Sequence, residues 1–274
     1  MNTKTKAWVS ALLLLVTLII NGMGGTGLIN GLSQQDISNM YPTLITPAPS
    51  TFSIWGVIYA FVIVSIIVMI LKSEDTYYAE AIDKISYLFW VSCILNSLWI
   101  ISFSYDLIGL STLIIFAFLI VLVIIVKQIG KIQTKKHWLL PITFGMYTGW
   151  LFIATVVNIT TWLVKLEWDG FGIPDATWAL IILIISVGLT FMVLFDIKNA
   201  IFPLPIAWAY FGIYNKLTSP EGYQGEYSLL QTAALIGIVV LIGIAAIQFY
   251  KNNYKIMPEG YVKTELTDAS DRRN

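Results

Sequence analysis

The sequence predicts an all-α integral membrane protein, and three observations lead to this fold class. Hydrophobic residues make up 57% of the 274-residue chain and charged residues only 12%, whereas a soluble domain carries about 25% charged residues. The hydrophobic residues gather in runs of about the 20 residues that cross a bilayer as a helix. The basic residues concentrate in every second connecting segment, as in multi-pass proteins. We therefore expect a bundle of transmembrane helices.

The apolar runs divide the chain into eight expected spans. The first run is treated as a span because the "NGMGG" that follows it is a poor signal-peptide cleavage site. The seventh run, "FPLPIAWAYFGIY", is short and contains two prolines, so a re-entrant segment stays open as an alternative. The spans are expected at about residues 7–22, 53–72, 85–104, 107–127, 138–160, 176–196, 199–215 and 228–250.

Lysine and arginine predict the orientation of the bundle. If the N-terminus is cytoplasmic, fourteen of the sixteen basic residues fall in cytoplasmic segments, and only Lys165 and Lys216 fall outside. Cytoplasmic loops carry such an excess of basic residues, so we expect both termini in the cytoplasm and the protein in the plasma membrane. Fourteen lysines against two arginines, with abundant Ile and Leu, are typical of an AT-rich bacterial genome.

Composition excludes several classes of function. Cys93 is the single cysteine and His137 the single histidine, so neither a disulfide framework nor a histidine metal cluster can form. The formal net charge of zero gives no attraction to nucleic acid. HExxH, GxSxG and P-loop sequences are missing from the chain. We predict no catalytic residue, no metal site and no nucleic-acid partner.

Amides and aromatic rings recur at helical spacing in three of the spans. An amide within an apolar span is costly unless it has a partner or a function, and residues three or four apart share one face of a helix. With the orientation above, these residues fall in the outer half of the bilayer, beneath the long loop at about 22–52. Asn96 and Asn158 could hydrogen-bond across helices, either only joining them or also shaping a pocket. The predicted ligand-binding residues are Trp55, Tyr59, Asn96, Trp99, Tyr147, Trp150, Ala154 and Asn158.

Three motifs in these spans resemble the translocator protein family, whose bacterial members are called TspO or tryptophan-rich sensory proteins. The motifs are "TPAPSTFSIWGVIY", then "LNSLW", then "YTGWLFIATVVNITTW". Their order and internal spacing agree with the family over about residues 1–165. The chain departs from the family pattern at Ser53, where a proline is usual, and at Leu110, where a tryptophan is common.

The resemblance implies a fold and a ligand. It implies a five-helix bundle with a pocket that is closed by the loop after the first helix and takes porphyrins, haem or sterols. We therefore expect a TspO-like five-helix domain at 1–165, about three additional transmembrane helices at 166–250, and a charged cytoplasmic tail at 251–274. No cofactor is expected, and porphyrin or haem would be a ligand.

The resulting hypothesis is a non-enzymatic protein that binds a hydrophobic small molecule within the lipid bilayer, in a sensory or ligand-handling role. A transporter or permease for such a compound is the main alternative. By the resemblance, light-dependent porphyrin degradation is a further one. Family members often form homodimers, and the additional helices could either cover that surface or contact a partner subunit.

Overall fold

A computed structural model describes residues 1–134 and 136–260. Most of the predicted tail, from residue 261 onward, lies outside the described residues. Within them the chain forms helices and no strand, and seven helices are long and apolar enough to cross a membrane. The prediction of an all-α integral membrane protein is confirmed. The α-helices are α1 (Thr3–Gly25), α2 (Gln34–Met40), α3 (Ile54–Leu71), α4 (Thr76–Ser104), α5 (Ile108–Ile132), α6 (Leu139–Lys165), α7 (Asp175–Ile197), α8 (Pro203–Thr218) and α9 (Ser228–Lys251).

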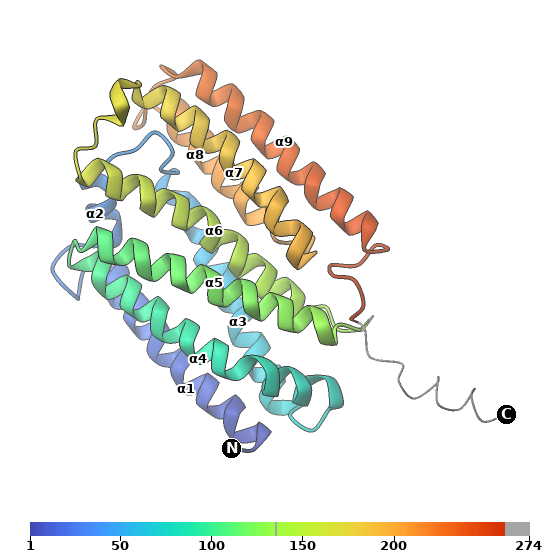
Figure 1. The fold of residues 1–274 in the computed structure, drawn as a ribbon. Coiled ribbons are helices and arrows are strands. Elements are labelled where there is room, and N and C mark those ends of the chain that lie inside the picture. The colour runs from blue at the N-terminus through green and yellow to red at the C-terminus, as the bar shows by residue number, and fades with distance from the viewer. Residues whose placement is uncertain (135, 261–274) are drawn as a thin grey trace.

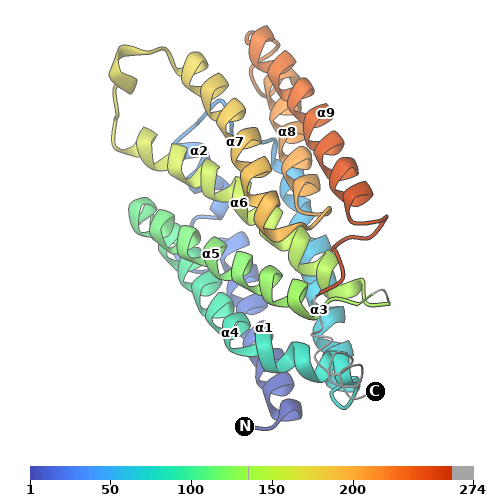
Figure 2. The same cartoon turned by 45° about the vertical axis from the view of Figure 1, so that its right-hand side comes forward.

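Helix α6 occupies the centre of the molecule. It lies between a group formed by α1, α4 and α5 and a second group formed by α7, α8 and α9, with α3 packed beside it (Figure 1). The view in Figure 2 shows the same order. Of the apolar stretch of α6, 72% is buried, against 28–50% for the other spans. The N-terminal end of α1 and the C-terminal end of α9 lie at the same end of the bundle (Figure 1).

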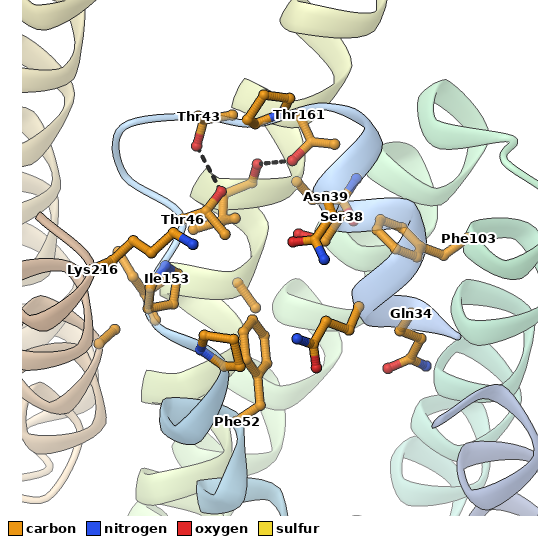
Figure 3. Close-up of a pocket in the computed structure, with 18 of the residues that line it drawn as sticks. Gln34, Ser38, Asn39, Thr43, Thr46, Phe52, Phe103, Ile153, Thr161 and Lys216 are labelled. Atoms are coloured by element: carbon orange, nitrogen blue, oxygen red, sulfur yellow. Dashed lines mark hydrogen bonds between the residues drawn. The ribbon is translucent and has the colours of Figure 1, made fainter. Parts of the chain in front are cut away.

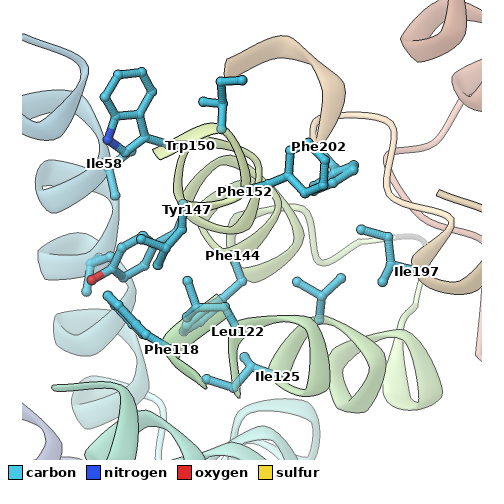
Figure 4. Close-up of a cluster of buried hydrophobic side chains, with 14 of the residues drawn as sticks. Ile58, Phe118, Leu122, Ile125, Phe144, Tyr147, Trp150, Phe152, Ile197 and Phe202 are labelled. Atoms are coloured by element: carbon cyan, nitrogen blue, oxygen red, sulfur yellow. The ribbon is translucent and has the colours of Figure 1, made fainter. Parts of the chain in front are cut away.

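The core follows from the two faces of α6. One face directs Phe144 and Tyr147 toward α3 and α5, where Tyr147 meets Phe118 edge to face with ring centroids 5.5 Å apart (Figure 4). The other face directs Phe152 toward Phe202, 5.8 Å away at the start of α8. Offset or edge-to-face ring pairs at these distances are favourable. One helix therefore packs against both groups.

Helix α8 is the expected seventh span, and it is short. It has 16 residues and extends about 24 Å at 1.5 Å per residue. A full span takes about 20 residues, so α8 is shorter than a full span. The turn before it is buried against α6. A Cβ at Gly149 would lie 2.1 Å from the carbonyl oxygen of Phe202, and one at Gly145 would lie 2.4 Å from the amide of Asn199. The turn thus lies well within the bundle, where only glycine lets the two backbones approach so closely.

The segment between α1 and α3 folds over one end of the bundle. Its helix α2 begins with a capping box in which Ser33 and Asp36 satisfy each other's backbone amides. The hydrogen bonds from Ser33 lower the pKa of Asp36, so this carboxylate acts as a helix cap. Farther along, the backbone amide of Ala48 donates to the carbonyl of Gly212 at 2.9 Å, and Trp208 Nε1 donates to the carbonyl of Thr51 at 2.9 Å. The loop is thereby tied to α8.

Candidate functional site

A cavity of about 510 Å³ lies under this loop, between α3, α4, α6 and α8 (Figure 3). Its size is within the range of about 300–1,000 Å³ that is usual for small-molecule sites. Helices supply one part of the wall and the loop the other. The lining includes Gln34, Ser38, Asn39, Thr43, Thr46, Pro47 and Phe52 from the loop and the short helical turn before α3, and Trp55, Trp99, Phe103, Trp150, Ala154, Asn158, Ala209 and Lys216 from the helices.

Aromatic rings form the deep end of the cavity. Trp55 stacks on Tyr59 at 5.3 Å and meets Trp150 edge to face at 6.2 Å. Phe52 meets Trp150 edge to face at 5.8 Å, and Trp99 lies 6.1 Å from Trp55. These rings come from α3, α4, α6 and the turn before α3. Such a cluster provides flat apolar surfaces in two orientations, which suits a flat or bulky apolar molecule.

Asn96 is fully buried in α4 and has partners on three other helices. Its Nδ2 donates to the hydroxyl of Tyr147 at 2.8 Å and to that of Tyr59 at 3.1 Å. Its Oδ1 accepts from Asn21 Nδ2 at 2.6 Å, and Asn21 Oδ1 accepts from the Tyr59 hydroxyl at 2.8 Å. Asn96, Tyr59 and Asn21 close a ring of hydrogen bonds beneath the aromatic cluster, and Tyr147 joins this ring through Asn96. The amide thus joins α1, α3, α4 and α6 and supports the cavity floor.

Asn158 makes a second polar junction, one level closer to the loop. Its Oδ1 accepts from Trp99 Nε1 at 3.0 Å, and its Nδ2 donates to Thr112 Oγ1 at 2.7 Å and to Ser111 Oγ at 3.1 Å. The sequence suggested that the two asparagines could hydrogen-bond to each other, but in the structure they do not. Each has its own partners because the indole of Trp99 takes the acceptor of Asn158. This bond also holds the Trp99 ring against the cavity.

The predicted residues therefore divide into two layers. Trp55, Trp99, Trp150, Ala154 and Asn158 line the cavity. The other three, Tyr59, Asn96 and Tyr147, lie beneath it in the hydrogen-bonded ring. Leu110, the position where the family has a tryptophan, does not line the cavity and is half exposed on α5. The leucine therefore leaves the wall of this cavity intact.

Sequence reasoning missed the polar rim, above all Lys216. This residue on α8 lines the cavity and points into it beside Thr46 (Figure 3). It is half-buried and has no ion pair or hydrogen bond from its ammonium within the described residues. No aspartate or glutamate lines the cavity. The cavity lining thus combines aromatic rings with hydrophilic groups and one positive charge.

The end of α8 is held in place by the loop that follows it. The backbone amide of Tyr223 donates to the carbonyl of Lys216 at 3.1 Å, and that of Gly225 donates to Leu217 at 2.9 Å. A Cβ at Gly222 would lie 1.8 Å from the Lys216 carbonyl oxygen, so the turn requires glycine there. Burial raises the pKa of the Tyr223 phenol, which also lines the cavity. The position of Lys216 is therefore set before any ligand arrives.

Comparison with known sequences agrees with this architecture. A sequence model of the family described as TSPO-like protein matches residues 7–247. The chain belongs to the TSPO-like family. It is a multi-pass membrane protein whose long apolar helices contact the lipid bilayer. The match extends beyond residue 165, where the recognised resemblance ends, and reaches into α9, so α7 and α8 are also part of the TSPO-like match. Searches of curated proteins and of solved structures found no match.

Proposed function

We propose that this TSPO-like protein binds an amphiphilic ligand, with a flat or bulky apolar body and an acidic edge, in the cavity beneath the α1–α3 loop. The observation that carries the proposal is the composition of the cavity lining, which combines the aromatic rings of Trp55, Trp99 and Trp150 with the positive charge of Lys216. Each ~100 Å² of apolar ligand surface removed from water would stabilise the complex by about 2.5 kcal/mol. Amides and hydroxyls at the rim would orient the ligand.

A carboxylated tetrapyrrole fits these features better than a sterol does. Trp150 and Thr161, both in the lining, are eleven residues apart on α6, which corresponds to about 16 Å along the helix. The lining thus extends over the length of a tetrapyrrole, whose apolar body would lie against Trp55 and Trp150 and whose acidic group would meet Lys216. Among the described residues, no His, Cys or Met side chain lines the cavity. The protein would therefore recognise the faces and edge of the macrocycle, and none of these side chains would coordinate a central metal.

Binding is favoured over the alternative of transport. A transported molecule must leave the cavity on the opposite side of the membrane. Tyr59, Asn96 and Tyr147 lie beneath the cavity, and Asn96 donates a hydrogen bond to each of the two tyrosines. Deeper still, Ser65 and Thr143 join α3 to α6 at 2.8 Å. Closed polar junctions of this kind suit a binding site with access from one side, in a sensory or ligand-handling protein.

A titration with protoporphyrin IX in detergent tests the proposal. We expect saturable binding by the wild-type protein, and a loss of affinity of about tenfold in each of Trp55→Phe and Trp150→Phe. Trp138→Phe is the matched control because Trp138 is 58% exposed and lies outside the cavity lining. Absence of saturable binding by the wild type, or equal losses in all three variants, would contradict the proposal.

A further inference from the structure

A second pocket, unrelated to the aromatic cavity, lies between the ends of α7 and α9. It has a volume of about 310 Å³. Apolar side chains from the two helices form its walls, among them Phe191, Phe195, Ile244 and Ile247, and Lys198 and Lys251 lie at its edge. Among the residues that the structure describes, no acidic residue lines it. The ends of α7 and α9 that carry these lysines lie at the same end of the bundle as the N-terminal end of α1 (Figure 1).

The pocket lies beside the α7–α8 turn and the chain that follows α9. The α7–α8 turn is recessed against α6, and the chain after α9 folds back across it. The backbone amide of Ala200 donates to the carbonyl of Ile256 at 2.8 Å. Asn252 Nδ2 donates to the carbonyls of Lys198 at 2.8 Å and Ile256 at 3.0 Å, and Gln248 Nε2 donates to Asn252 Oδ1 at 2.8 Å. These bonds fix the two lysine-bearing helix ends relative to each other.

The two lysines are exposed and have no ion pair within the part of the chain that the structure describes. The nearest acidic residue along α7, Asp196, is 3.0 Å from Lys127 of α5 and is therefore already paired. The walls beside the lysines belong to the lipid-facing surface, since Phe195 and Ile247 are 61% and 57% exposed. The pocket thus combines two ammonium groups that have no ion pair among the described residues with an apolar surface that faces the lipid acyl chains.

We propose that this pocket binds an acidic phospholipid, with the headgroup phosphate between Lys198 and Lys251 and an acyl chain along Phe191 and Phe195. Basic pockets between transmembrane helices on the cytoplasmic side are typical sites for acidic lipid headgroups. The basic residues of the sequence predict that this end faces the cytoplasm. By bridging the ends of α7 and α9, the lipid stabilises the group of helices that carries Lys216. The proposal does not depend on any ligand in the aromatic cavity.

Lipid binding can be measured by native mass spectrometry and by the thermal unfolding midpoint of the full-length protein in detergent. We expect phosphatidylglycerol to bind at least about fivefold more tightly than phosphatidylcholine with the same acyl chains, and to raise the unfolding midpoint more. Lys198→Gln combined with Lys251→Gln should remove this preference, and Lys198→Arg combined with Lys251→Arg should keep it. Lys4→Gln combined with Lys131→Gln removes the same charge elsewhere at this end and should leave the preference unchanged.

Three outcomes would overturn the proposal. One is equal binding of the two lipids by the wild type. Another is a preference that survives in the double glutamine variant. The third is an equal loss in the Lys4 and Lys131 control, which would indicate attraction to the basic surface as a whole. Glycerol phosphate without acyl chains should give no stabilisation, because the apolar walls are part of the site. If it stabilised the protein as well as the lipid does, the site would be an anion site only.

Discussion

Asn96 and Tyr147 are joined across α4 and α6 by a hydrogen bond of 2.8 Å between the amide Nδ2 and the phenol oxygen. The bond lies directly beneath the ring of Trp55, whose centroid is 6.0 Å from that of Tyr147. The polar network and the aromatic cluster are therefore one structure, in which the network fixes the helices that carry the rings. An amide in an apolar span joins helices here and also sets the floor of the cavity.

Replacing Asn96 with Leu should destabilise the bundle. Tyr59, Tyr147 and Asn21 would each lose a partner while staying buried, and an unsatisfied buried group costs about 1–3 kcal/mol. We expect a loss of about 2 kcal/mol, measured as a lower thermal unfolding midpoint in detergent. Asn39→Leu, at the exposed rim, is the control and should have little effect. Equal midpoints for wild type and Asn96→Leu would show that the ring of hydrogen bonds contributes no stability.

Gly149→Ala should separate α6 from α8. The added Cβ would meet the backbone carbonyl of Phe202 at 2.1 Å, and a backbone atom cannot move aside as a flexible side chain can. We expect a loss of at least about 2 kcal/mol, in the range of overpacked cores. Gly188→Ala on α7, where no atom lies within 4 Å of the new Cβ, should be neutral or slightly stabilising. Comparable destabilisation by both variants would contradict the close contact.

The sequence predicted the seven long apolar helices and the helical faces on which the candidate site residues lie, whereas the expected span at 199–215 is a helix of only 16 residues. Length and hydropathy determine transmembrane helices, and spacings of three or four residues place Trp55 and Tyr59, or Trp150 and Ala154, on one face. The division into lining and supporting layers could not be read in this way. This division depends on which helix lies opposite each residue. Asn158, for example, accepts a hydrogen bond from Trp99 and makes none to Asn96.

The polar rim could not be predicted because its residues come together only in the folded chain. Lys216 lies about 60 residues beyond the last predicted site residue and was assigned to an outside loop. The structure instead places it in the last turn of α8, directed into the cavity. Asn21 was missed for a similar reason, since it lies at the edge of the first apolar run and only the fold brings it to Asn96. The sequence does contain both features, a lysine near the end of an apolar run and an amide at the edge of a span. It does not show which distant residues they contact.

Filling the cavity should abolish binding without harming the fold. Ala154 lines the cavity, so Ala154→Leu would place three extra carbon atoms in existing space beside the Trp150 ring. We expect an unfolding midpoint equal to or above that of the wild type, with protoporphyrin affinity reduced at least about tenfold. Ala60→Leu on the exposed side of α3 should leave both quantities unchanged. Retained affinity in Ala154→Leu would place the ligand elsewhere.

Lys216 should discriminate acidic ligands from neutral ones. Lys216→Gln removes the positive charge from the cavity, and we expect protoporphyrin IX affinity to fall about tenfold, or about 1.4 kcal/mol. The dimethyl ester of protoporphyrin, which has no carboxylate, should bind wild type and variant equally. Lys216→Arg should retain most of the preference for the acid. If the acid and the ester bind the wild type with equal affinity, ligand binding in the cavity stands but recognition of an acidic group does not.

His137 should make stability depend on pH near neutrality. It lies between α5 and α6, where it stacks on Tyr77 at 3.7 Å and bonds to Thr134 through Nδ1 at 2.5 Å. Burial lowers the pKa of His137, and the charges of Lys72 and Lys136 lower it further while Asp75 opposes them. Because the folded state disfavours the protonated ring, its stabilisation is complete above the unfolded pKa of about 6.5 and decreases as the pH falls below that value.

The pH dependence can be assigned to His137 with a variant that keeps the stacked ring. His137→Phe preserves an aromatic face against Tyr77 and cannot titrate. We expect the wild-type unfolding midpoint to fall between pH 7.5 and pH 5.5, and the fall to be smaller in His137→Phe. Both proteins should behave alike above pH 7.5, because the ring is neutral there in the folded and unfolded states. A fall of the same size in both proteins would assign the acid sensitivity to other groups.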